Sequence, residues 1–327
     1  MSRFVMSRTP FRISFFGGGT DYQSWCRHNE GAVLSSSIDK YCYIMGRWLP
    51  PFFSHRHSIA WSYLEHCQDA SDILHPSVRE TMKFLGIERG LEMHHMADLP
   101  ARTGIGSSSS FTVGLLNVLH GLKGDQVEKM PLAREAIKIE QDLIGENVGS
   151  QDQVSAAVGG FNRIDFSGNE IKVSPIKSRR ILELEGKLLL FFTGFSRSSS
   201  ALSAEYIRNM GQNRMKLKRI YSMVSEAERI LTEGDDLNDF GRLLHQGWLL
   251  KRRLSEKISN DQIDDIYRKA RRAGALGGKL CGAGGGGFMI FFVEQERQLS
   301  VKKALSQLLE VPFKFDSDGS QLIFNGR

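Results

Sequence analysis

The sequence predicts a mixed α/β (α+β) protein of two domains. Its 327 residues are 41% hydrophobic and 24% charged, which is enough apolar material for two cores. In the first half, apolar strand-like runs alternate with helical patterns. Near residues 168–186 this pattern loosens into a polar stretch, after which apolar runs resume. We therefore expect one domain over residues 1–180 and a second over residues 181–327.

The first half contains two predicted strands and two predicted helices. The strands are Phe11–Phe16, an apolar run that ends in three glycines, and Ala32–Trp48. Apolar residues recur every three or four positions in Phe111–Leu122 and Leu132–Ile144, so both segments are predicted helices.

The second half contains longer helical patterns between short apolar runs. Continuous apolar runs predict strands at 187–193 and 288–293. Charged stretches with helical periodicity predict helices at 201–231, 237–257 and 263–273. Two further short strands, at 312–315 and 322–324, are separated by Asp316–Ser320 and predict a closing hairpin.

Composition narrows the classes of partner. The chain carries 43 Lys and Arg against 37 Asp and Glu, a net charge of +6. The basic clusters contain almost no aromatic residues, so solvated helix faces or an anionic small-molecule substrate explain them better than nucleic acid. No stretch reaches the ~18 apolar residues of a membrane span, and the start of the chain lacks the apolar core of a signal peptide. We expect a cytoplasmic protein without a membrane partner.

The four cysteines show no CxxC spacing, which indicates neither a zinc site nor a disulfide framework. Glycine is the unusual residue: 33 glycines make up about a tenth of the chain, against a typical ~7%. Twelve of them lie in three clusters, which are Gly17–Gly19, Gly104 with Gly106, and the seven glycines within 277–287. Such clusters are expected where the backbone takes positive φ or approaches a ligand closely.

The segment Pro100–Ser110 leads directly into the helix predicted from Phe111. Free N–H groups at a helix N-terminus, the helix dipole and four hydroxyls together favour an anion such as phosphate. The alternative is that the serines only cap the helix, although one serine would suffice for that. The phosphate-binding candidates are Thr103, Gly104, Ile105, Gly106, Ser107, Ser108, Ser109 and Ser110.

Two other nucleotide-binding motifs are disfavoured. A Walker loop requires Ser or Thr after its lysine, whereas Lys279 is followed by Leu280. The run Gly282–Gly287 matches GxGxxG but leads into a strand instead of a helix, so a dinucleotide site is not indicated. We expect this run to form a backbone-rich loop that lies against a ligand or a second loop.

Charged residues mark two further segments. Asp21 follows the triple-glycine turn, and an Asp in that place is often a helix N-cap. Ser150 and Gln153 fit a capping box, which would place Asp152 in the first turn of a helix, where the dipole favours its ionised form. For Glu140, a solvated helix face is the simpler interpretation from the residues alone.

Four segments together resemble, in order, the motifs of the GHMP small-molecule kinases: Arg12–Tyr22, Pro100–Ser110, Gly149–Asp152 and Gly282–Gly287. The resemblance spans nearly the whole chain. The Gly-Gly-Gly-Thr-Asp form of the first motif is similar to the branch that contains D-glycero-D-manno-heptose 7-phosphate kinases and fucokinases. Galactokinases and mevalonate kinases usually carry Gly-Glu-His there.

The resemblance implies a ribosomal-S5-like N-terminal domain, a ferredoxin-like C-terminal domain and an active site between them. It implies ATP phosphates on residues 103–110, Asp152 as the catalytic aspartate assisted by Arg12, and Mg²⁺ held by Ser108 and Glu140. It also implies a small-molecule sugar or sugar phosphate as partner, no nucleic acid, and a monomer or homodimer. The implied substrate-binding residues are Gly18, Gly19, Thr20, Asp21, Arg197, Gly284 and Gly285.

The expected reaction is transfer of the ATP γ-phosphoryl group to the anomeric hydroxyl of D-glycero-D-manno-heptose 7-phosphate. One alternative is a kinase for a free sugar such as fucose or galactose, which would need no extra phosphate pocket. Another is a non-catalytic sugar sensor on the same fold, whose marks would be a damaged 100–110 loop or a missing Asp152. A nucleic-acid-binding module is the third alternative, suggested by the net charge and an S5-like domain.

Overall fold

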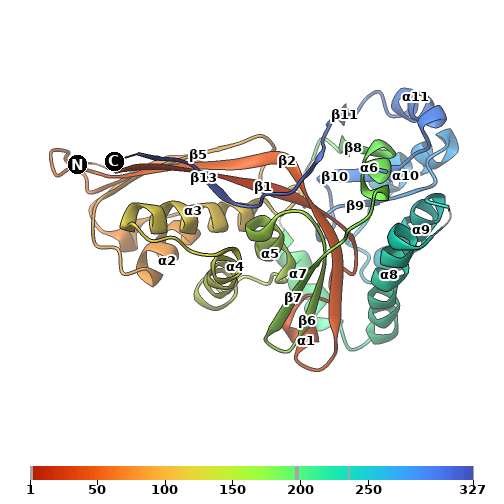
Figure 1. The fold of residues 1–327 in the computed structure, drawn as a ribbon, viewed down its shortest axis with the longest axis horizontal. Coiled ribbons are helices and arrows are strands. Elements are labelled where there is room, and N and C mark those ends of the chain that lie inside the picture. Colours follow the sequence, from red (N-terminus) through yellow and green to blue (C-terminus); the bar gives the residue numbers. More distant parts are fainter. Residues whose placement is uncertain (1–2, 196–198, 235, 327) are drawn as a thin grey trace.

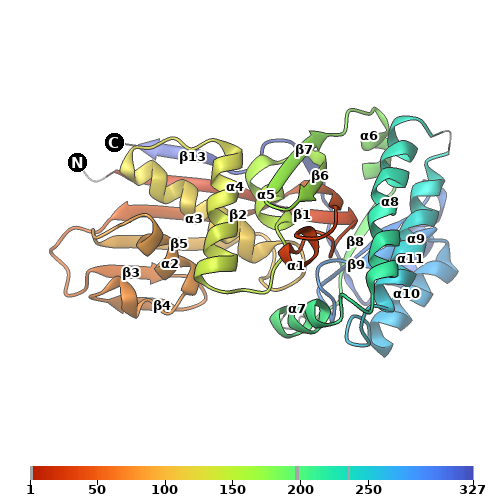
Figure 2. The same cartoon turned by 90° about the horizontal axis from the view of Figure 1, so that it is seen from below.

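Two α/β domains lie side by side, and the long strands of the first domain reach the edge of the second (Figures 1 and 2). The computed structural model describes residues 3–195, 199–234 and 236–326. Among these residues, no helix is long and apolar enough to cross a membrane. The mixed α/β class predicted from the sequence is confirmed.

The first sheet is built around two long antiparallel strands, β1 (Phe4–Phe16) and β2 (Gly31–Trp48). Strand β2 is long enough to take different partners along its length: β6 (Phe161–Ser167) beside its first half and β5 (Leu91–Ala97) beside its second. Further strands extend the sheet at its edges, namely β3 (His57–Ala60), β4 (Leu64–Cys67), β7 (Glu170–Pro175), β12 (Phe315–Asp316) and β13 (Gln321–Gly326).

Helix α3 (Ser107–Lys123) covers the centre of this sheet (Figure 1). It begins four residues before the predicted Phe111, so the serines form its first turn instead of preceding it. Gly114 allows its close approach, because a Cβ atom there would lie 2.8 Å from the Thr9 hydroxyl oxygen of β1. Other short helices of this domain are α1 (Gln23–Cys26), a 3₁₀ turn (Ala70–Asp72), α2 (Pro76–Phe84), α4 (Lys129–Lys138), a π-helical turn (Ile139–Leu143) and α5 (Gln151–Val158).

The second sheet has four antiparallel strands in the order β11-β8-β10-β9. Its strands are β8 (Leu188–Phe192), β9 (Gly277–Leu280), β10 (Phe288–Phe292) and β11 (Leu309–Glu310). Its helices are α6 (Arg180–Gly186), α7 (Ser199–Arg208), α8 (Arg214–Thr232), α9 (Asn238–Arg252), α10 (Asp261–Ala273) and α11 (Gln295–Ala304). In chain order, helices α7–α10 follow β8, strands β9 and β10 come next, and α11 lies between β10 and β11. This is the βαββαβ order of a ferredoxin-like domain.

The predicted closing hairpin is wrong. Strand β12 pairs with β2, where Phe315 lies opposite Ile38, and β13 pairs with β1, where Gly326 lies opposite Phe4. The two strands therefore extend the first sheet instead of pairing with each other, and the chain ends lie close together (Figure 1). The boundary near residue 180 stays a prediction, but residues 315–326 belong to the first sheet.

Aromatic side chains join the two domains. Phe15 and Phe16, at the end of β1, meet Phe240 of α9 in edge-to-face contacts with ring centroids 5.6 and 5.1 Å apart. All three side chains are at most 3% exposed. The end of β1 is therefore part of a core that both domains share, directly before the Gly17–Gly19 turn.

Candidate active site

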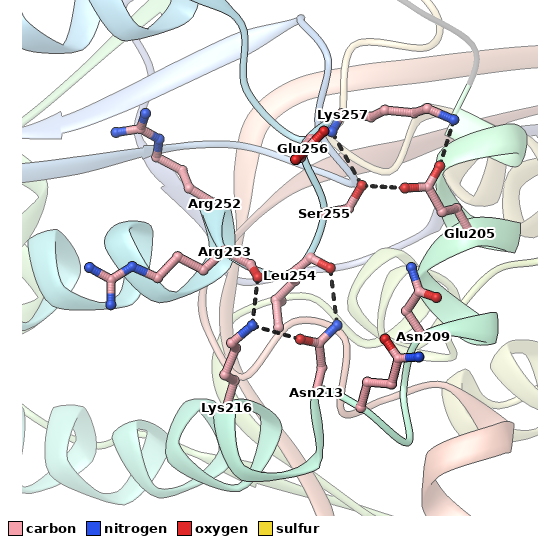
Figure 3. A pocket seen from close by; sticks show the side chains of 11 residues that line it. Glu205, Asn209, Asn213, Lys216, Arg252, Arg253, Leu254, Ser255, Glu256 and Lys257 are labelled. Atoms are coloured by element: carbon pink, nitrogen blue, oxygen red, sulfur yellow. Dashed lines mark hydrogen bonds and ion pairs between the residues drawn. The ribbon is translucent and has the colours of Figure 1, made fainter.

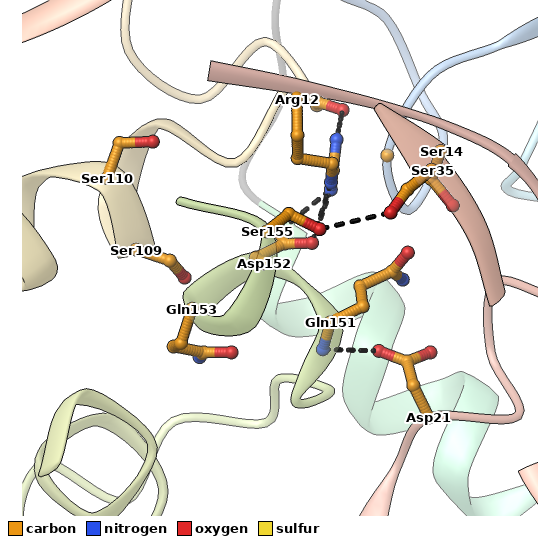
Figure 4. A network of polar contacts seen from close by, with 12 residues as sticks. Arg12, Ser14, Asp21, Ser35, Ser109, Ser110, Gln151, Asp152, Gln153 and Ser155 are labelled. Atoms are coloured by element: carbon orange, nitrogen blue, oxygen red, sulfur yellow. Dashed lines mark hydrogen bonds and ion pairs between the residues drawn. The ribbon is translucent and has the colours of Figure 1, made fainter. Parts of the chain in front are cut away.

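Arg12 and Asp152 form a bidentate ion pair where the two domains meet (Figure 4). The Nε and Nη2 atoms of Arg12 donate to the two carboxylate oxygens of Asp152 at 2.7 and 2.8 Å. The third nitrogen, Nη1, donates to the Gly104 carbonyl oxygen at 2.8 Å. Arg12 is 4% exposed, whereas the Asp152 side chain is 26% exposed. The arginine is thus a fixed support, and the carboxylate is open on one side.

Asp152 lies in the first turn of α5 as predicted, but the capping box does not form. The Ser150 hydroxyl accepts from Gln141, and the Gln153 amide donates to Glu140, so neither side chain caps the helix. Asp21 takes that place, because one of its carboxylate oxygens accepts from the Gln151 N–H at 3.3 Å. A distant carboxylate therefore supplies the cap that the sequence assigned to a neighbouring serine.

Asp21 is buried beside Asp152. Its other carboxylate oxygen accepts from the Gly19 N–H at 2.9 Å, and its burial raises its pKa, with a further contribution from the Asp152 charge. Thr20 is fully buried, and its hydroxyl donates to the Gly17 carbonyl within the turn. Gly149 makes room for Asp21, since a Cβ atom there would lie 1.9 Å from its carboxylate. The turn thus holds Asp21, which is 1% exposed, as a buried carboxylate bonded to the backbone, and the Thr20 side chain is turned inward.

The start of α3 has free backbone donors. Gly106 precedes the helix with φ of 76°, and no side chain of the described residues caps the helix, so the alternative of redundant serine caps is wrong. Ser110 donates instead to the Pro10 carbonyl and Thr103 to the Pro100 carbonyl. Ser108 is exposed, and within the described residues its hydroxyl has no hydrogen-bond partner. The first turn of α3 can therefore offer N–H groups and the Ser108 hydroxyl to an anion.

The glycine loop, defined as residues 281–287 between β9 and β10, packs on the loop before α3. A Cβ atom at Gly104 would lie 2.5 Å from the Cys281 carbonyl oxygen, and one at Gly287 would lie 2.2 Å from that of Thr103. Gly285 donates to the Ile258 carbonyl at 3.0 Å, and a Cβ atom at Gly284 would lie 2.8 Å from the Cα atom of Ile258. The expectation of a loop that lies against a second loop is confirmed.

Glu140 is 1% exposed in the π-helical turn, so the solvated-face interpretation is wrong. One carboxylate oxygen accepts from Gln153 and, at 2.8 Å, from the Ser109 hydroxyl, whereas Ser108 makes no such bond in the described chain. The other oxygen is buried and has no partner among the described residues. Burial raises the pKa of Glu140 to about 7.

These donors fit a magnesium ion. The unpartnered Glu140 oxygen and the exposed Ser108 hydroxyl are hard ligands of the kind that Mg²⁺ takes together with phosphate oxygens and water. Across residues 3–195, 199–234 and 236–326, no group of three or more His, Cys, Asp and Glu side chains could hold a metal by itself. A metal bound here would therefore depend on a phosphate ligand.

The structure brings further residues to this region that the sequence reasoning missed. The Tyr206 hydroxyl of α7 is buried without a hydrogen-bond partner in the described parts of the chain, and a Cβ atom at Gly19 would lie 2.0 Å from it. A tyrosine in a charged helical stretch gave no signal for this contact. Lys251 and Lys279 also reach the glycine loop or the end of β1. Arg197 lies outside the described residues.

A separate cavity of about 430 Å³ lies between the end of α7, the start of α8 and the segment after α9 (Figure 3). Most of its cations already have partners: Lys257 pairs with Glu205, and Lys216 donates to Asn213 and to the Arg253 carbonyl. The cavity adjoins the glycine loop through Ile258, which follows Lys257 and contacts Gly284.

Known proteins resemble this chain along its whole length. A D-glycero-alpha-D-manno-heptose 7-phosphate kinase of Campylobacter jejuni is 29% identical over 96% of this chain and 97% of that protein. A galactokinase of Pyrococcus furiosus is 23% identical over 92% of each chain. A bifunctional fucokinase/GDP-fucose pyrophosphorylase of Arabidopsis thaliana is 26% identical over 94% of this chain, which matches 31% of that protein.

A solved structure and two family models also match this chain. The crystal structure of a D-glycero-D-manno-heptose 1-phosphate kinase from Bacteroides thetaiotaomicron superposes with a TM-score of 0.80 at 24% identity, and the match covers 98% of this chain and 99% of that one. The model of the GHMP kinase N-terminal domain matches residues 73–160, and that of the GHMP kinase C-terminal domain matches residues 223–311. The chain therefore belongs to the GHMP kinases, a family of phosphotransferases that use ATP as phosphate donor.

Proposed function

We propose that this sugar kinase transfers the γ-phosphoryl group of ATP to the anomeric hydroxyl of D-glycero-D-manno-heptose 7-phosphate, giving the 1,7-bisphosphate. The observation that carries the chemistry is the Arg12–Asp152 pair, which holds an open carboxylate beside the loop that leads into α3. The full-length likeness to a heptose 7-phosphate kinase supports the choice of sugar.

Asp152 is the group that accepts or orients the proton of the attacking hydroxyl. The anomeric oxygen attacks the γ-phosphorus, the bond from that phosphorus to the bridging oxygen of ADP breaks, and the hydroxyl proton passes to the Asp152 carboxylate. An anomeric hydroxyl is more acidic than an ordinary alcohol, so a carboxylate paired with Arg12 suffices as base. Asp21, the backbone of Gly18 and Gly19, and the Tyr206 hydroxyl, which has no partner among the described residues, would bind sugar hydroxyls.

The phosphates of ATP would lie at the start of α3. Its free N–H groups and positive dipole end offset phosphate charge, and the glycine loop, with Gly284 and Gly285, would border them from the second domain. Ser108 and Glu140 would hold a Mg²⁺ ion, which neutralises charge on the β- and γ-phosphates when it is bound.

A free sugar such as fucose or galactose is the second candidate substrate. The likeness to a fucokinase and to a galactokinase over more than nine-tenths of this chain favours it. Such a sugar would use the same Asp152 chemistry but no cation for a terminal phosphate.

The test is ADP release from Mg-ATP with a panel of free hexoses, free heptoses and their terminal phosphates. We expect heptose 7-phosphate to give the highest kcat/KM, and a free sugar that is turned over while the heptose phosphate is inert would favour the second candidate.

Asp152→Asn should lower kcat by about 10³-fold with ATP affinity nearly unchanged. Asp165→Asn is the matched control, because Asp165 also pairs with an arginine, Arg163, away from the site. Full turnover by Asp152→Asn would remove Asp152 from the reaction.

A further inference from the structure

Two lysines that the proposed mechanism does not use converge behind the candidate site. Lys279 of β9 is 8% exposed, and its Nζ donates to the carbonyl oxygens of Ser14 and Phe15 at 2.6 and 2.9 Å. Lys251 of α9 donates to the carbonyl oxygen of Leu280 at 3.1 Å and also to that of Gly282. We call these two residues the lysine clamp.

The lysine clamp holds positive charge without a carboxylate. In the ranges that the structure describes, neither ammonium group lies within ion-pair distance of an acidic side chain; both are bonded to backbone carbonyls instead. Burying an unpaired ammonium group destabilises the folded state, and an apolar side chain of similar length would fill the same space without that cost. The two charges are therefore best explained by the segments whose carbonyl groups they bind, which are the end of β1 and the end of β9 with the glycine loop.

Those carbonyls lie on both walls of the candidate site. Ser14 and Phe15 lie on β1 between Arg12 and Phe16, the last residue before the Gly17–Gly19 turn. Gly282 belongs to the glycine loop, where a Cβ atom on it would lie 2.3 Å from the Cα atom of Gly104. Lys279 thus joins the second sheet to the strand that carries Arg12, while Lys251 fixes the loop that rests on Gly104.

On the basis of the proposed function, we propose that Lys279 and Lys251 are positioning residues for phosphoryl transfer. They hold the end of β1 and the glycine loop in one arrangement, so that Arg12 keeps Asp152 and the Gly104 carbonyl in place. Neither lysine needs to touch a substrate for this role. A displacement of about 1 Å in such a support can cost about 10²-fold in rate.

Protonation of the lysine clamp should then control turnover. Burial and, to a smaller extent, the nearby Arg12 charge lower the pKa of Lys279 to about 8, against an opposing contribution from Cys281. Burial and the charge of Lys279 lower the pKa of Lys251. As pH rises through about 8, Lys279 loses its charge, its bonds to Ser14 and Phe15 weaken, and kcat should fall.

Loss of activity by this route differs from simple unfolding. Because the pKa of Lys279 is lower in the folded chain than in the unfolded chain, the unfolded state binds more protons between about pH 8 and 10.5. The contribution of Lys279 to the free energy of unfolding therefore rises with pH in the range where kcat falls. A lysine with only a structural role would not make kcat fall over the pH range in which the free energy of unfolding rises.

The experiment compares the wild type with Lys279→Met, Lys279→Arg and Lys187→Met. Lys187 is the matched control, because it is a largely buried lysine, 15% exposed, that pairs with Glu294 away from the site. We expect Lys279→Met to speed amide hydrogen exchange about tenfold in peptides covering residues 9–22 and 277–288, and in no other part of the sheets. Its kcat should fall about 10²-fold while the KM for ATP stays within about threefold.

Two outcomes would overturn the proposal. One is unchanged exchange in both peptides of Lys279→Met, a measurement that does not require kinase activity and so stands even if the proposed function fails. The other is an identical alkaline fall of kcat in the wild type and in Lys279→Arg, whose guanidinium stays charged and should keep kcat level to about pH 9.5. If Lys279→Met does not fold, the arginine variant and the wild-type pH profile decide alone.

Discussion

Glu140 is a carboxyl group whose surroundings oppose its charge. It is 1% exposed, its pKa is raised to about 7 by burial, and one of its oxygens has no partner in the described residues. The folded state therefore keeps a proton that the unfolded state releases near pH 4.5, and wild-type stability falls as pH rises from about 4.5 through 7. Glu140→Gln keeps the shape and removes this titration, so its free energy of unfolding should exceed that of the wild type by about 2–3 kcal/mol at pH 8. Urea denaturation at pH 4.5 and pH 8 measures the difference.

The control for that prediction is Asp142→Asn, which changes an exposed carboxylate two residues away. Its stability should run parallel to that of the wild type at both pH values. The same Glu140→Gln enzyme should need about tenfold more Mg²⁺ for half-maximal rate, because a metal-ligand oxygen is lost. Parallel stability curves for Glu140→Gln and the wild type would show that Glu140 is ionised in the folded chain without cost.

Residue types in the motifs were readable from the sequence, but their partners were not. Arg12 and Asp152 could be named, yet 140 positions separate them, and only the fold shows that they form a bidentate pair. Ser150 and Gln153 matched a capping box, but both side chains bond to groups outside α5, which a local pattern cannot contain. Tertiary contacts decided each of these bonds.

At the scale of elements, the glycine clusters mark where two loops meet. Gly104, with φ of 81°, touches the Cys281 carbonyl of the glycine loop, and this contact was predicted only as a loop against a ligand or a second loop. Helical periodicity predicted α3 well, but the apolar pattern starts at Phe111 and so could not show that the serines form the first turn. The pairing of β12 and β13 with the first sheet was missed, because a local turn pattern does not reveal a partner 277 or more residues away.

Gly104→Ala tests the contact between the two loops. An alanine at positive φ costs about 1–2 kcal/mol by itself, and its Cβ atom would also lie 2.5 Å from a backbone oxygen that cannot move freely. We expect the free energy of unfolding to fall by about 3 kcal/mol or more, and kcat to fall at least about tenfold. Denaturation curves and steady-state kinetics measure the two effects.

Gly168→Ala is the matched control, since Gly168 also has positive φ, 57°, but has nothing within 4 Å of the added Cβ atom. It should show only the backbone cost and a normal kcat. Equal stability losses in the two variants would mean that the loops separate easily and that their contact contributes little.

At the scale of the whole molecule, two domains share one continuous set of supports for the site. Two domains were predictable from the length, the amount of apolar residues and the loosened pattern near residues 168–186. Their joint core was not, because Phe15 and Phe240 look like ordinary strand and helix residues in the sequence. The end of β1 is held by aromatic contacts with α9 and by Lys279 of β9, so the second domain stabilises the strand that carries Arg12.

Phe240→Ala tests this coupling between the domains. Phe240 is fully buried against Phe15 and Phe16, so its truncation should lower the free energy of unfolding by about 3–5 kcal/mol. Phe324→Ala is the control, because Phe324 is 50% exposed beside Phe4 and should cost less than about 1 kcal/mol. With the shared core weakened, hydrogen exchange in urea should show the two sheets losing protection at different concentrations, whereas the wild type loses both together. If Phe240→Ala still unfolds in a single step with a loss no larger than that of Phe324→Ala, the domains are held together by contacts other than this aromatic core.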